Sequence, residues 1–259
     1  MTVGKWCANP HAGEFTYDRA SLRKAWARLH AGDAEPLPRD EAVIDAWALF
    51  HNGELQKAAE AGLAAGDAGM TVANKATAIH ANYLEKKEKN KLELLMQVAE
   101  RAKAQAAQDE TNANAWYWQG YALGRYSQGI SVAKALAQGL GQRVKEAFEK
   151  TIRLQPRHAD AHVALGAFHA EVIDKVGSLI GGLTYGAKKE TGLLLFRQAL
   201  EIHPASPIAM IEYANGLLML EGDKKSKEAA RLYEQAAACK PMDATEQLDV
   251  DLAKSELDN

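Results

Sequence analysis

The sequence predicts an all-α fold built from repeated helical hairpins, of which the third and fourth are elongated. Apolar positions three and four apart recur in almost every segment, whereas alternating β-branched runs are nearly absent. Three proline-terminated segments also fall into a common register, which indicates an internal repeat. Finally, two neighbouring repeats carry about a dozen extra residues at the same place, the turn between their helices. These observations favour a helical repeat protein.

The composition is that of an ordinary globular chain. The 259 residues are enough to bury a sizeable core, and the formal net charge of -3 gives no field that favours nucleic acid or an anionic membrane. The two cysteines lie at opposite ends of the chain, which argues against a disulfide framework. The longest uncharged run, residues 176–187, is too short to span a bilayer. We therefore expect a cytoplasmic protein with no membrane span, no signal peptide and no nucleic-acid partner.

The elements are expected in a regular order along the chain. An N-terminal extension and capping helix occupy residues 1–38, with the helix near 18–30, and divergent hairpins occupy 39–112. In that second region, helices over 39–50 and 54–65 form one hairpin, and helices over 72–87 and 89–107 form the next. Clear repeats with two insertions occupy 113–241, and a C-terminal capping helix lies within 242–259. Polar-faced end helices cover the apolar faces that terminal repeats would otherwise expose.

The repeat is clearest at the second helix of each hairpin. Phe148, Phe196 and Tyr233 each precede a proline by eight residues. The proline lacks a donor and restricts the residue before it, so each of these helices is expected to end there. In the first helices, a small residue (Gly120, Gly166 or Ala214) is expected where the paired helix crosses closely, with the aromatic residue of the second helix filling the groove beside it.

These residues resemble the tetratricopeptide repeat (TPR), whose first helix reads W-x2-L-G-x2-Y. Trp116-x2-Gln119-Gly120-x2-Leu123 is similar to that pattern, with Trp116 at the tryptophan place and therefore expected in the core. The resemblance implies a right-handed α-solenoid of TPR-like hairpins that binds a partner or a ligand. Over roughly the last 150 residues the chain also resembles two elongated relatives, the T-component of TRAP-type transporters and the regulator of microtubule dynamics proteins.

The two insertions distinguish this chain from an ordinary repeat. Gly120 and Phe148 are 28 residues apart, and Gly166 and Phe196 are 30 apart, where sixteen is usual. If the extra residues lengthen both helices of a hairpin, each helix grows by roughly 10 Å at 1.5 Å per residue. The inserted residues are apolar and glycine-rich, so they either extend the core, line a pocket or form a patch for a partner.

The predicted binding residues come from the first aromatic helix and from these insertions. Aromatic and arginine side chains are common interface anchors, and the inserted apolar side chains are too many to remain wet on two hairpins. The predicted set is Trp118, Tyr121, Arg125, Tyr126, Ile130, Leu136, Leu140, Leu179, Ile180, Leu183 and Tyr185.

No residue pattern indicates catalysis or a cofactor. His158, His162 and His169 have metal-like spacing, but two of them occupy packing places of the repeat and no carboxylate completes a set. Neither an acid–base pair nor a nucleophile motif is present. The sequence therefore predicts a non-enzymatic protein with no metal and no cofactor. Its function is protein–protein interaction, with a protein partner or self-association; the alternative is binding of an apolar small molecule between the elongated hairpins.

Overall fold

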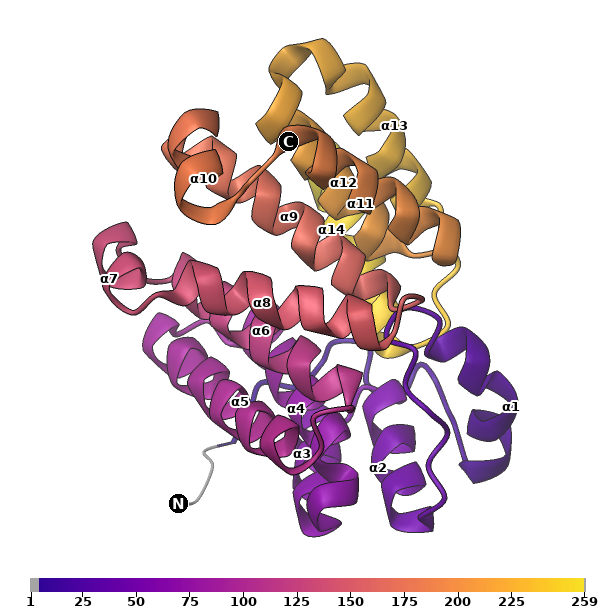
Figure 1. Cartoon of the computed structure of the whole chain (residues 1–259). Coiled ribbons are helices and arrows are strands. Elements are labelled where there is room, and N and C mark those ends of the chain that lie inside the picture. Colours follow the sequence, from indigo (N-terminus) through magenta and orange to yellow (C-terminus); the bar gives the residue numbers. More distant parts are fainter. Residues whose placement is uncertain (1–4, 259) are drawn as a thin grey trace. The chain divides into compact units, whose positions relative to one another are not determined.

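The computed structural model describes residues 5–258, and every regular element in that range is a helix (Figure 1). The predicted all-α fold of helical hairpins is confirmed. The chain forms two compact units. The first comprises residues 5–29, 35–147 and 242–245, and the second comprises residues 30–34, 148–241 and 246–258.

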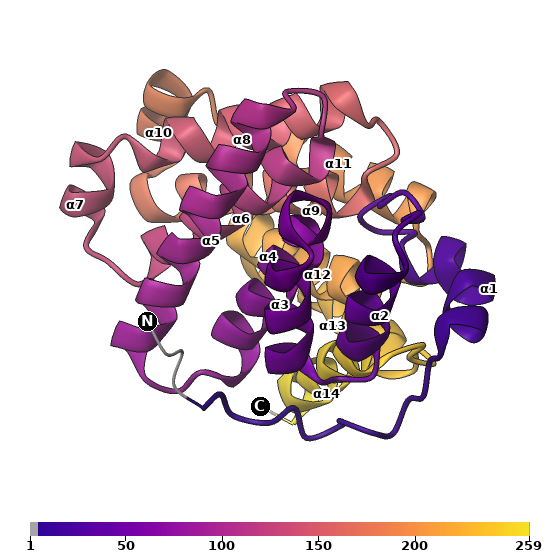
Figure 2. The ribbon, with the colours of Figure 1, turned by 90° about the horizontal axis from the view of Figure 1, so that it is seen from below.

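The first unit contains the capping helix and the hairpins that follow it. Its helices are α1 (Arg19–Leu29), α2 (Glu41–His51), α3 (Leu55–Ala64), α4 (Met70–Ile79), α5 (Glu88–Gln108), α6 (Ala113–Gln128) and the short α7 (Val132–Ala137). Helices α2, α3 and α4 lie side by side (Figure 2), and α5 packs along α6. Helices α1 to α4 share an apolar core that centres on Trp47, Phe50 and Ile44, all fully buried.

The second unit contains the most regular hairpins. Its helices are α9 (Ala159–Val176), the short α10 (Ser178–Tyr185), α11 (Lys189–Ile202), α12 (Pro207–Glu221) and α13 (Ser226–Ala237). Two further helices, α8 (Leu140–Leu154) and α14 (Ala244–Leu257), carry residues of both units. The predicted helix ends hold for α8 and α11, which each stop two residues before a proline, Pro156 or Pro204, whereas α13 stops at Ala237, four residues before Pro241.

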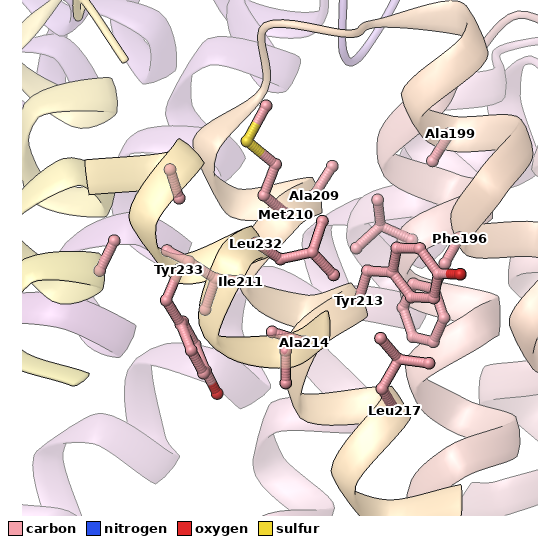
Figure 3. Packing of buried hydrophobic residues seen from close by; sticks show 14 residues of the cluster. Phe196, Ala199, Ala209, Met210, Ile211, Tyr213, Ala214, Leu217, Leu232 and Tyr233 are labelled. Carbon is pink, nitrogen blue, oxygen red and sulfur yellow. The ribbon is translucent and has the colours of Figure 1, made fainter. Parts of the chain in front are cut away.

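The core of the second unit confirms the predicted pairing of a small residue with an aromatic ring. Phe196 is fully buried and stacks on Tyr213, with ring centroids 5.4 Å apart (Figure 3). A Cβ atom added at Gly166 would lie 3.1 Å from the Phe196 ring, and one added at Gly216 would overlap Cε2 of the same ring. Glycine at both positions therefore lets α9 and α12 approach this ring closely.

Two elements differ from the expectation. The helix expected over 72–87 ends as α4 at Ile79 and continues as a single π-helical turn, η2 (His80–Leu84). Trp116, expected in the core, is only half-buried, whereas its neighbours Tyr117 and Trp118 are 5% and 2% exposed. The buried faces of α6 thus include the residues just after the tryptophan place of the repeat.

The insertions do more than lengthen the helices that flank them. Part of each forms a separate short helix, α7 in the first unit and α10 in the second. Glycines interrupt the chain at these points: Gly139, Gly177 and Gly186 have φ angles of 60°, 80° and 64°, a region that other residues rarely adopt. The inserted residues therefore form separate short helices instead of continuing α6 and α9.

Candidate functional site

Helix α10 folds back on α9 and packs against it along one side. Gly177 ends α9, its N–H donating to the Ile173 carbonyl at 2.8 Å, and α10 begins at the next residue. A Cβ at Gly181 would lie 2.9 Å from Val172 Cγ1, so only glycine allows this approach. The Tyr185 ring meets Phe168 edge-on at 6.3 Å. Gly181 and Tyr185 thus form the packed side of α10.

The opposite side of α10 is an aliphatic surface. Leu179, Ile180 and Leu183 are 74%, 57% and 81% exposed. They occur at positions i, i+1 and i+4, which share one side of a helix. We call these three residues the α10 surface. Residues 176–187 contain no charged group, and the polar side chains beside the surface are the small hydroxyls of Ser178 and Thr184.

Lysines lie at both ends of this uncharged stretch. Lys175 is 3.3 Å from Glu171, and Lys189 is 2.8 Å from Glu221, whose pKa this hydrogen bond holds below its usual value. Lys188 is exposed beside them. Two of these three lysines are paired with carboxylates, so the α10 surface is an apolar area whose ends carry charges of both signs.

The first insertion presents a smaller surface of its own. Ser131 caps α7, accepting a hydrogen bond from the Lys134 N–H at 3.3 Å, and no α7 residue is buried. Leu136 is 49% exposed and Ile130 is half-buried, whereas Leu140 at the start of α8 is 2% exposed. Sequence reasoning missed Val132, which is 52% exposed and lies one turn before Leu136. Their i, i+4 spacing was the available signal.

The aromatic residues of α6 form a ladder within the first unit. Trp118 meets Tyr117 at 4.9 Å and Tyr121 at 5.3 Å, both close to edge-on. The Arg125 guanidinium lies 5.5 Å from the centre of the Tyr121 ring, and Tyr126 is half-buried. Trp118 is buried and packs beneath the other aromatic rings of α6. Tyr121 and Arg125 are partly exposed, so they are the members of this group that a partner could contact.

The three histidines with metal-like spacing are engaged by backbone groups. His158 Nδ1 accepts the N–H of Ala161 at 3.1 Å and caps α9, and His162 Nδ1 lies 3.0 Å from the His158 carbonyl oxygen. His169 Nδ1 accepts the Lys188 N–H at 3.1 Å. Each ring thus has a structural role in the second unit. Across residues 5–258 no group of three histidine, cysteine or acidic side chains is arranged to hold a metal ion.

Comparison with known proteins supports the fold. A thermophilic TPR protein from Thermus thermophilus, known from its crystal structure, superposes with a TM-score of 0.58 at 16% identity, covering 83% of this chain and 97% of that chain. The fold is TPR-like. No protein-family profile and no curated protein sequence matches this chain. The likeness to the TRAP-type T-component stays a resemblance of sequence.

Within residues 5–258, no helix is both long enough and apolar enough to cross a membrane. The α10 surface is the most exposed aliphatic group among the predicted binding residues.

Proposed function

We propose that this protein is an interaction scaffold that binds a partner protein through the α10 surface. The observation that carries the proposal is the two-sided character of α10. Gly181 and Tyr185 pack inward, whereas Leu179, Ile180 and Leu183 are each more than half exposed. Side chains of this kind are usually buried, and a cluster of them on one helix is typical of a docking site.

The chemistry of the surface specifies its partner. Three aliphatic side chains without a charged neighbour fit an apolar groove. Charges of both signs lie at its ends, Lys175 beside Asp174 and Lys188 near Glu190, and they favour a groove with polar and charged residues at its rim. Interfaces of this type have an apolar centre and a polar rim. The partner proposed is therefore a protein with an apolar groove and a polar rim.

The test replaces single leucines of the surface and compares them with a leucine elsewhere. Leu179→Ser and Leu183→Ser are expected to change stability by less than about 0.5 kcal/mol, because the side chains are exposed in the free protein. Leu257→Ser, at a position 43% exposed on α14, is the matched control. Partner binding, measured by quantitative affinity capture from the source organism, should fall at least tenfold for the two α10 variants and stay unchanged for the control.

The same variants separate the other functions. Self-association would appear as a concentration-dependent sedimentation coefficient that both α10 variants lower. Binding of an apolar small molecule would appear as saturable binding of a hydrophobic dye that both variants abolish while capture of a protein partner is unaffected. That last result would overturn the proposal in favour of a small-molecule carrier. The expected cytoplasmic location, which rests on cysteine usage, stays a prediction.

A further inference from the structure

A buried polar cluster lies between α4 and α5, helices that carry none of the predicted binding residues. Thr71, Asn74 and Thr77 are three residues apart along one face of α4, and all are at most 5% exposed. Arg101 and Gln105 are one turn apart on α5. We call these five residues the α4–α5 cluster. Helix interfaces are usually apolar, so five polar residues at one contact require an explanation.

Two hydrogen bonds fix how α4 and α5 are aligned within the cluster. The Arg101 Nη2 donates to Thr77 Oγ1 at 2.9 Å, and Gln105 Nε2 donates to Thr71 Oγ1 at 3.0 Å. The Thr77 hydroxyl in turn donates to the Ala73 carbonyl at 2.7 Å. Asn74 lies midway between Thr71 and Thr77 on α4, so these bonds place it opposite the gap between Gln105 and Arg101.

Four polar side-chain atoms of the cluster have no hydrogen-bond partner among residues 5–258. They are both side-chain atoms of Asn74, the Nε of Arg101 and the Oε1 of Gln105, all buried. A buried polar atom without a partner costs free energy, and several at one place are unusual in a native core. Such a group is expected where a bound molecule supplies the missing partners.

Arg101 adds a positive charge to the cluster. The residues one turn away on α5 are Gln97 and Gln105, and the facing positions of α4 carry hydroxyl and amide groups. Burial lowers the pKa of Arg101, and no carboxylate within residues 5–258 acts on it in the opposite direction. A buried cation normally has an anionic partner, because charges lose much of their hydration on burial.

We propose that the α4–α5 cluster binds a small carboxylate. Arg101 Nε and Asn74 Nδ2 donate to its two oxygens. Rotation of the Gln105 amide presents Nε2 as a third donor, with the Thr71 hydroxyl then donating to Oε1. Asn74 Oδ1 remains an acceptor for a hydroxyl beside the carboxylate. A short 2-hydroxy acid thus satisfies every polar atom of the cluster.

The burial of the cluster sets the size of the ligand. Asn74 is fully buried, whereas Arg101 is only partly buried and connects the cluster with solvent. The charged group of the ligand therefore approaches along the Arg101 side chain, and the ligand has to be small to lie against the fully buried Asn74. The carboxylate belongs either to a free small acid or to the C-terminus of a peptide.

Thermal unfolding with sodium glycolate, against sodium chloride at equal ionic strength, tests the site. Glycolate should raise the Tm saturably, by about 5 °C at 100 times its Kd, and acetate should do so more weakly. Arg101→Met should abolish the shift, and Arg197→Met, at an exposed arginine of α11, should keep it. A glycolate response no larger than that of chloride, or one unchanged in Arg101→Met, would overturn the proposal.

A second measurement uses the unaltered protein, in case Arg101→Met does not fold. Phenylglyoxal modifies accessible arginines, and peptide mass spectrometry gives the rate at each one. Glycolate should slow modification of Arg101 at least tenfold and leave Arg197 unaffected; equal rates at Arg101 with and without glycolate would contradict the site. A short peptide with a free C-terminus, compared with its amide, distinguishes the two ligand sources by competition with glycolate.

Discussion

The contact of Phe196 with Gly216 offers a direct test of how the second unit packs. Phe196 is fully buried and stacks on Tyr213, so Phe196→Ala should lower the free energy of unfolding by about 3–5 kcal/mol. Gly216→Ala places a methyl group against Phe196 Cε2, inside van der Waals distance. Overpacking of this kind costs roughly 1–3 kcal/mol, from which the better helix propensity of alanine recovers up to about 1 kcal/mol.

The decisive quantity is the coupling between these two substitutions. In the Phe196→Ala background the clash is absent, so Gly216→Ala should become stabilising by up to about 1 kcal/mol. Gly182→Ala is the control, because its new Cβ meets only the Ala187 carbonyl oxygen at 3.6 Å. Urea unfolding followed by circular dichroism gives each free energy and checks that the m-value is constant. A Gly216→Ala effect that is the same in both backgrounds would refute the packing described here.

Three further predictions concern single groups. His80 is buried against Trp6, and burial lowers its pKa below 6.5 despite the opposing charge of Glu85. On acidification the unfolded chain therefore takes up the proton before the folded chain, so stability is lost as pH falls below about 6.5. Urea titrations at several pH values should show a smaller loss for His80→Phe. Gly186→Ala should destabilise the protein by about 1–2 kcal/mol in the same assay, because φ is 64° there. Asp243→Ala removes the buried 2.6 Å hydrogen bond with His51 in the first unit and should cost about 1–3 kcal/mol, whereas Asp243→Asn should cost less because its Oδ1 still accepts the Thr245 N–H.

The helical repeat was predictable because it depends on local rules. Prolines at 156 and 204 end helices wherever they occur, and a glycine beside an aromatic at fixed spacing describes a contact between neighbouring helices. Both rules act over a few tens of residues. The contact of Gly166 with Phe196 could therefore be predicted even though an insertion of unusual length separates the two residues.

The site was only partly predictable, because exposure depends on tertiary packing. Leu179 and Leu140 look alike in the sequence, yet one is 74% exposed and the other 2%. The difference arises from the turn at Gly177, which places α10 on α9 with one side outward. The α4–α5 cluster was missed because arginine and glutamine, here Arg101 and Gln105, are residue types that usually face solvent. Its signal was the spacing of Thr71, Asn74 and Thr77 along one face of an otherwise apolar helix.

Site-specific photo-crosslinking tests the interaction proposal most directly. A p-benzoylphenylalanine residue replaces Ile180, at the centre of the α10 surface, or Leu257 as the control, and the protein is irradiated in cells of the source organism. We predict one discrete protein adduct from position 180, absent from position 257 and lost when Leu183→Ser is added. No protein adduct from position 180, or the same adducts from both positions, would contradict the proposal that α10 docks a partner protein.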